Sequence, residues 1–248
     1  MLVTTEAVVL STLKYGETSK IAHIYTKDFG KTSIIAKGVR TAKSKLASFI
    51  EPLNYCNFTF YKKRTSNLHL LSKAEFVKNF PYIKNSFHNL IIGFSLLEAI
   101  MKTQEENDAN VDIFNLLIKS ISLLNEQEVS PFSVFASFHI YLSKKLGFML
   151  NFNDFEIKDK CNNFSILFNI ENGKIDSSKE KSNGNSIPLN SQVLEKIKKL
   201  SNLKIEECPI IEITESELRY VNDLFIRYYS YHLDKAICFN SLDFLQNK

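Results

Sequence analysis

The chain has 248 residues, of which 44% are hydrophobic and 23% charged, with a formal net charge of +4. This composition is typical of a globular protein with a substantial core. Its seven glycines form neither a Walker loop nor a dinucleotide-binding loop, which argues against nucleotide-hydrolysing enzymes and dehydrogenases.

The first 80 residues predict a small antiparallel barrel. In the fourth predicted strand, Cys56, Phe58 and Phe60 alternate with polar residues and Tyr61, as expected for a strand with one buried face. The interruption before this strand is where an OB-fold carries its extra segment. Five closely spaced strands are predicted, over 6–13, 18–27, 31–37, 53–62 and 68–75.

After Pro81 the pattern becomes helical. Apolar residues recur every three or four positions over 86–103 and 111–125. Ser130-Pro131 predicts a helix start, and Thr214 with Glu217 predicts a capping box.

The segment 151–188 is polar and irregular, with a hairpin signal at Asn172-Gly173. We therefore expect an α+β fold: a five-stranded OB-fold barrel over 1–80 and an all-helical domain over 81–248, with a small irregular hairpin insertion at about 151–188.

Charge is unevenly distributed along the chain. Residues 1–80 hold 13 Lys and Arg against 5 Asp and Glu, a balance of +8, and the remaining residues hold 18 against 22, a balance of −4. The N-terminal part is therefore expected to meet an anionic partner. Binding of a nucleic acid requires cations for phosphates and flat groups on which bases stack. The candidate DNA-binding residues are Lys37, Arg40, Lys43 and Lys45 after the third strand, and Tyr61, Lys62, Lys63 and Arg64 at the end of the fourth.

The order of motifs is similar to that of the RecO family of bacterial recombination mediators and DNA repair proteins. The resemblance is strongest over 6–53, where a strand, "YGE", "YTKDFGK" and "AKGVR" follow one another. It continues in "LHLLSKAE" and the C-terminal "YYSYHLD". It implies a non-enzymatic protein that binds single- and double-stranded DNA, anneals complementary strands and helps load recombinase. The partners implied are RecR, the C-terminal tail of the single-strand-binding protein and, indirectly, the recombinase.

One departure from this family concerns zinc. Many relatives carry two Cys-x-x-Cys pairs in the region corresponding to 161–210, whereas here Phe164 and Ile211 stand three residues after Cys161 and Cys208. A closed zinc site needs four ligands, and this segment offers two cysteines and no histidine. We therefore expect no zinc and no other cofactor.

The start of the chain lacks the features of a secretory signal, and no stretch reaches the roughly 18 apolar residues of a membrane span. The cysteines show no pairing motif, which favours a reducing compartment. We expect a cytoplasmic, nucleoid-associated protein with no membrane partner.

Two other functions stay open from the residues alone. A basic barrel also suits an adaptor that binds RNA or an acidic protein. A metal-dependent nuclease would need carboxylates held by rigid elements, whereas the candidates fall in polar loops: Asp154, Glu156, Asp159, Glu206 and Glu207.

Overall fold

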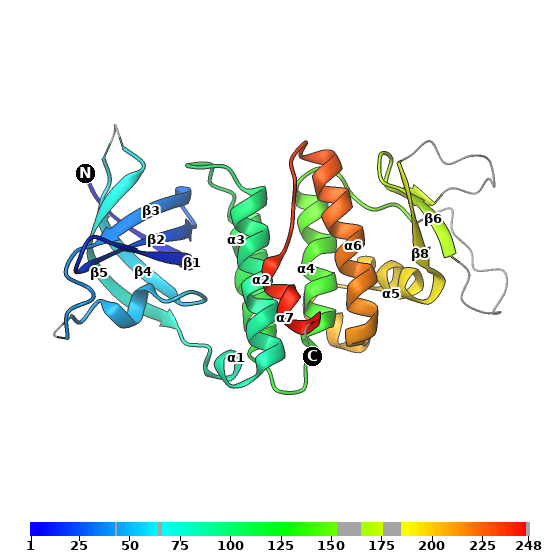
Figure 1. Ribbon diagram of the computed structural model, residues 1–248, viewed down its shortest axis with the longest axis horizontal. Helices are drawn as coiled ribbons and strands as arrows, with labels where there is room; N and C mark the ends of the chain where they lie inside the picture. Colours follow the sequence, from blue (N-terminus) through cyan, green and yellow to red (C-terminus); the bar gives the residue numbers. More distant parts are fainter. Residues whose placement is uncertain (43, 64–65, 153–164, 176–184, 247–248) are drawn as a thin grey trace. The chain divides into compact units, whose positions relative to one another are not determined.

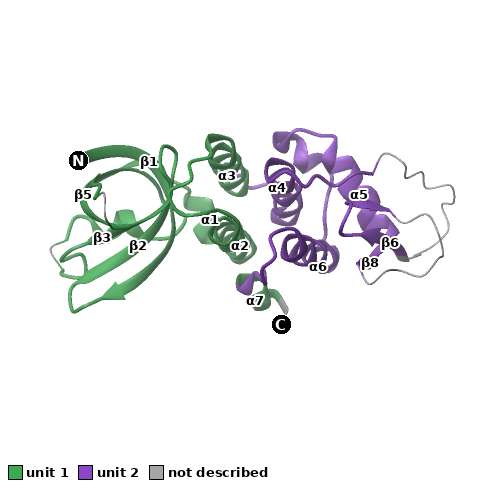
Figure 2. Ribbon diagram, turned by 90° about the horizontal axis from the view of Figure 1, so that it is seen from above, with its two compact units in different colours: residues 1–125, 241–248 green, residues 126–240 purple. Residues whose placement is uncertain are grey.

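The computed structural model describes residues 1–42, 44–63, 66–152, 165–175 and 185–246. The chain forms two compact units (Figure 2). Unit 1 comprises residues 1–125 and 241–248, and unit 2 comprises residues 126–240. The helices that directly follow the barrel therefore group with it, although the change from strand to helix occurs at Pro81 as the sequence indicates.

A closed five-stranded barrel forms the N-terminal part of unit 1 (Figure 1). Its strands pair in the order β1-β2-β3-β5-β4, and β4 closes the barrel on β1. All pairs are antiparallel except β3 with β5. This confirms the predicted α+β class and barrel. The strands are β1 (Leu2–Tyr15), β2 (Ser19–Thr26), β3 (Gly30–Ala36), β4 (Tyr55–Tyr61) and β5 (Leu68–Lys78).

The barrel core follows from side-chain alternation. On β4, Cys56, Phe58 and Phe60 are fully buried, and Tyr61 is exposed, as predicted. Inward-facing residues of the other strands join the same core, including Ala7, Ile24 and Ile34. The connection between β3 and β4 contains the short 3-10 helix η1 (Ala47–Ile50), whose Ile50 is buried in this core. Burial on one face of each strand thus fixes the register of the pairing.

Helices of unit 1 pack on the barrel through a few close contacts. Leu53 adopts a positive φ of 69°. Its side chain packs so close to Gly93 that a Cβ on Gly93 would lie 3.0 Å from a Leu53 methyl carbon. The turn before β3 approaches the connection between helices so closely that a Cβ on Gly30 would lie 2.0 Å from the Asp108 carbonyl oxygen. These helices are α1 (Pro81–Asn85), α2 (Phe87–Thr103) and α3 (Val111–Leu124).

The C-terminal residues also belong to unit 1. The 3-10 helix η3 (Asn240–Leu242) leads into α7 (Asp243–Gln246). The Ser241 hydroxyl donates to Glu98 Oε1 on α2 at 2.7 Å, and the Ser241 backbone N–H donates to the same carboxylate at 3.2 Å. Glu98 thereby satisfies donors at the start of a helical turn.

Unit 2 is a helical bundle with a small sheet. Its helices are α4 (Pro131–Lys145), α5 (Ser191–Ser201) and α6 (Glu215–His232), with the 3-10 helix η2 (Ile205–Ile210). The sheet has the order β7-β6-β8 and is antiparallel. Its strands are β6 (Ser165–Asn169), β7 (Lys174–Ile175) and β8 (Ser186–Asn190). The predicted hairpin forms around Gly173, whose φ is 68°.

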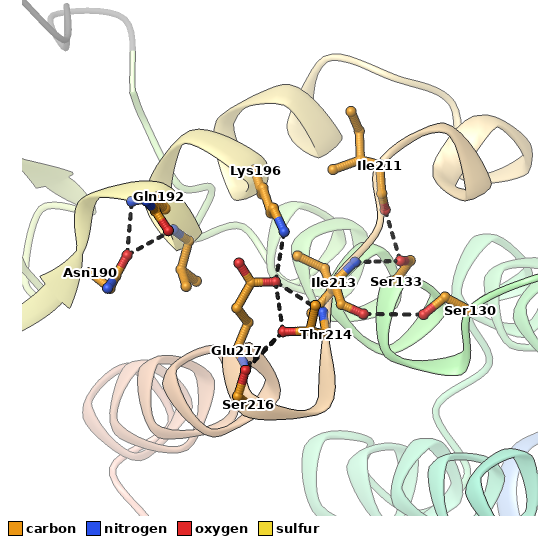
Figure 3. A network of polar contacts seen from close by, with 11 residues as sticks. Ser130, Ser133, Asn190, Gln192, Lys196, Ile211, Ile213, Thr214, Ser216 and Glu217 are labelled. Carbon is orange, nitrogen blue, oxygen red and sulfur yellow. Dashed lines mark hydrogen bonds and ion pairs between the residues drawn. The ribbon is translucent and has the colours of Figure 1, made fainter. Parts of the chain in front are cut away.

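A polar network joins the helix starts of unit 2 (Figure 3). Thr214 and Glu217 form the predicted capping box of α6, and Glu217 also accepts from Lys196 Nζ on α5 at 2.7 Å. Ser133 on α4 donates to the Ile211 carbonyl and accepts from the Ile213 N–H. Because it bonds both backbone groups, Ser133 fixes the chain that enters α6.

Candidate nucleic-acid interface

The loop that leaves β3 presents exposed cations. Lys37, Arg40 and Lys45 are all exposed, and Gly38 turns the chain with a φ of 65°. The Arg40 guanidinium donates to the carbonyl oxygens of Gly16 and Glu17, at 3.2 and 2.8 Å. Arg40 therefore holds this loop against the β1–β2 turn as well as adding charge. Lys43, predicted to act with these residues, lies outside the described residues.

The second basic cluster extends β4 beyond the barrel. Lys63 is exposed, while Lys62 lies with Nζ 3.9 Å from the centroid of the Phe29 ring, a cation–π contact. The predicted Arg64 lies outside the described residues. Tyr61, just before the lysines, is 49% exposed.

Strand pairing places the two clusters at opposite ends of the barrel. Lys20 pairs with Ala36, so the exit of β3 lies beside the β1–β2 turn. Lys62 instead contacts Phe29, in the turn that joins β2 to β3 at the other end. The clusters are therefore not a single patch, and the outer face of β2, β3 and β5 runs between them.

A row of apolar residues crosses this outer face. The pairs Leu13–Ile21, Ile21–Ile35, Ile35–Leu70 and Leu70–Tyr61 are each directly opposed on neighbouring strands. Opposed residues point to the same side of a sheet, so the five form one line across the strands. Leu13 is 45% exposed, and the three central residues are partly exposed. The sequence alone did not identify this row, because the alternation reveals outward positions but not which ones meet.

Tyr55, at the start of β4, has a different environment from Tyr61. It is buried, its hydroxyl donates to Glu6, and its ring lies edge-on to Phe114 of α3, with centroids 6.1 Å apart. Burial and the Glu6 carboxylate raise the pKa of Tyr55 above its usual value. Tyr55 is therefore packed inside unit 1, whereas Tyr61 is 49% exposed and remains the candidate for base stacking.

Several barrel lysines have partners within unit 1. Lys20 pairs with Glu51 at 2.9 Å, and Lys27 pairs with Glu6 at 3.2 Å. Lys31 donates to the carbonyl oxygens of Met101 and Gln104, at 3.0 and 2.7 Å, at the C-terminal end of α2. A cation there compensates the negative end of the helix dipole. Lys31 is thus a structural residue.

The described residues contain no cluster of three or more His, Cys, Asp or Glu side chains able to hold a metal. Cys208 is buried, and this burial raises the pKa of its thiol to about 11. Cys161, Asp154, Glu156 and Asp159 lie outside the described residues. Glu207 is engaged by the Lys204 backbone N–H at 2.7 Å. The described part of this segment provides one cysteine, Cys208, as a candidate zinc ligand.

No helix in the described ranges is long and apolar enough to cross a membrane. Comparison with known proteins then places both parts of the chain in one family. Residues 1–80 match the family described as Recombination protein O N terminal, and residues 84–238 match Recombination protein O C terminal. The first match ends where the barrel ends, and the second begins within α1.

Three similar proteins bear the name DNA repair protein RecO. That of Chloroherpeton thalassium is 27% identical over 97% of this chain and 96% of its own length. That of Alkaliphilus metalliredigens is 28% identical over 98% of each chain, and that of Prosthecochloris aestuarii is 32% identical over 60% of this chain and 56% of its own. Because the family matches extend over nearly all of the barrel and the helices, the chain belongs to the Recombination protein O family.

Proposed function

We propose that this protein acts in DNA repair and homologous recombination as a non-enzymatic mediator. It binds single- and double-stranded DNA through the barrel, anneals complementary strands and helps load recombinase onto DNA coated by single-strand-binding protein. The observation that carries the proposal is the apolar row ending at Tyr61, which lies between two basic clusters on the barrel surface. Membership of a family whose relatives are named DNA repair proteins supports the same function.

The chemistry of this surface suits DNA without regard to sequence. Lysines contact phosphates and release counterions, which gives affinity that falls as salt rises. Aliphatic residues and one tyrosine contact base faces, which every base presents, rather than base edges. Neutralising the phosphates of two strands on the two basic clusters lowers the mutual repulsion of the strands, so annealing needs no ATP.

Partner binding belongs to the same proposal. RecR, the C-terminal tail of the single-strand-binding protein and, indirectly, the recombinase are proposed partners, with the helical part docking proteins. We also propose that the protein works without zinc, so metal analysis of the purified protein should find no stoichiometric zinc. Pull-downs with single-stranded DNA, RecR or the tail peptide, which compare the wild-type chain with the variant lacking Lys62 and Lys63, test the division of roles.

The direct test measures DNA affinity by fluorescence anisotropy at several salt concentrations, together with annealing of labelled complementary strands. Replacing Lys62 and Lys63 with Ala should weaken single-strand binding and reduce the slope of log K against log salt by about 1.4. Replacing the exposed Lys144 and Lys174 of unit 2 removes the same charge and should leave the slope unchanged.

Three results would contradict this proposal. DNA affinity that does not depend on salt, or that does not fall when Lys62 and Lys63 are replaced, would show that these residues of the barrel do not bind DNA. Tight binding of structured RNA with indifference to DNA would favour the adaptor function. Cleavage of DNA with magnesium or manganese would identify a nuclease.

A further inference from the structure

The barrel contains one buried histidine directly beneath the second basic cluster. His69, on β5, is 1% exposed, and its ring stacks on Phe60 with centroids 5.4 Å apart and planes 6° apart. The Lys63 backbone N–H donates to His69 Nδ1 at 3.2 Å. Because Nδ1 is the acceptor, the neutral ring carries its proton on Nε2.

This hydrogen bond holds a segment that the sheet does not. The last β4–β5 pair is Tyr61 with Leu70, so Lys63 lies beyond the main-chain ladder. Lys62 is held separately, by backbone hydrogen bonds with Met1 and by its contact with Phe29. The His69 side chain therefore supplies the acceptor that the ladder would otherwise provide to Lys63.

We propose that His69 is a positioning residue that fixes the backbone at Lys63 and thereby presents Lys63, next to Lys62, to DNA. This inference rests on the proposed function, because it assumes that these lysines contact phosphates. Its role depends on the neutral ring: a proton on Nδ1 would place two donors face to face and break the hydrogen bond.

The surroundings of His69 oppose that proton. Burial and the charges of Lys62 and Lys63 lower its pKa below the usual value. The Phe60 ring that stacks on His69 carries no charge, and neither does Phe29, which packs against Phe60. The Met1 ammonium donates to the Lys62 carbonyl oxygen at 3.1 Å.

Two amide variants separate the role of Nδ1 from that of the ring. In His69→Asn the side-chain oxygen can take the place of Nδ1, whereas in His69→Gln it takes the place of Nε2. Amide hydrogen exchange without DNA should show Lys63 exchanging about fivefold faster in His69→Gln and near the wild-type rate in His69→Asn. The Kd for single-stranded DNA should rise severalfold in His69→Gln and stay within twofold in His69→Asn.

The outcomes distinguish this inference from the proposed function. Equal Lys63 exchange in wild type and His69→Gln would overturn the positioning role, whatever the DNA affinity. Faster exchange with unchanged DNA affinity would overturn the link to DNA, and the double Lys variant would then show whether the lysines bind DNA at all.

If His69→Gln fails to fold, the wild-type protein still gives an answer. Its ¹⁵N spectrum should show Nε2 as the protonated ring nitrogen, and protection of the Lys63 amide should fall only below about pH 6.5. A proton on Nδ1 at neutral pH, or protection that does not change on acidification to the point where His69 titrates, would overturn the inference.

Discussion

The Tyr229 hydroxyl makes two hydrogen bonds to the same residue, His139, across α4 and α6. It donates to the His139 carbonyl oxygen at 3.0 Å and lies 3.1 Å from His139 Nδ1. Since its single proton goes to the carbonyl, its oxygen accepts from Nδ1–H, which sets the tautomer of a fully buried histidine. Nδ1 of this core histidine is thus satisfied, while Nε2 has no partner among the described residues.

Acid should destabilise the protein through His139. Burial lowers its pKa to about 3, so the folded state stays neutral while the unfolded state takes up a proton below about pH 6.5. The free energy of unfolding should therefore fall by about 1.4 kcal/mol per pH unit as pH drops from 6.5 towards 3. His139→Asn keeps a donor but does not titrate, so urea unfolding at several pH values should show a slope smaller by that amount. Equal slopes in the two proteins would contradict the assignment.

Gly30 should be the least replaceable glycine of the barrel. Its φ is 66°, and a Cβ there would lie 2.0 Å from the Asp108 carbonyl oxygen, so alanine adds a clash to backbone strain. Gly38 has a φ of 65° but no atom within 4 Å of such a Cβ. Gly38→Ala should cost about 1 kcal/mol of unfolding free energy, and Gly30→Ala a further 1–3 kcal/mol or more. Similar costs for both variants would show that the close approach does not govern stability.

Lys31 and Lys63 should have opposite phenotypes although both are barrel lysines. Lys31→Met removes two charge-assisted hydrogen bonds to α2 carbonyls and should lower the unfolding free energy by about 1.5–3 kcal/mol, with DNA affinity within about twofold. Lys63→Met should leave thermal stability unchanged and weaken DNA binding in a salt-dependent way. Thermal unfolding and anisotropy on both variants check the contrast, and a reversal would contradict the assignment of their roles.

Tyr61 should contribute base stacking rather than charge. Tyr61→Ala should weaken single-strand binding by about 1–3 kcal/mol without changing the salt slope. Tyr82, on α1, is 46% exposed and serves as the matched control. Anisotropy with single-stranded DNA should show no loss for Tyr82→Ala. An equal loss in the two variants would mean that Tyr61 is not a specific contact.

The spacing of apolar residues and the residues typical of helix caps predict most of the strands and helices. The features that they do not predict depend on tertiary contacts. The barrel strands follow from alternation, and Ser130-Pro131 and Thr214 mark real helix starts. Helix α5 was not predicted, because its many lysines obscure the apolar pattern. Its buried residues nevertheless have helical spacing: Val193, Leu194, Ile197 and Leu200. The role of Lys31 and the apolar row of the barrel depend on which segments meet, which a single sequence does not reveal.

The hydrogen bonds between Glu98 and Ser241 have a consequence for chain connectivity. Because residues on both sides of unit 2 belong to unit 1, unit 2 is an insertion with two covalent attachments rather than a C-terminal appendage. When unit 2 is folded, the separation of its ends is fixed, and α7 docks at a smaller entropic cost than at the end of an unfolded loop. Each unit is therefore expected to stabilise the other through the two covalent connections, and loss of the contact between Ser241 and Glu98 should weaken this coupling.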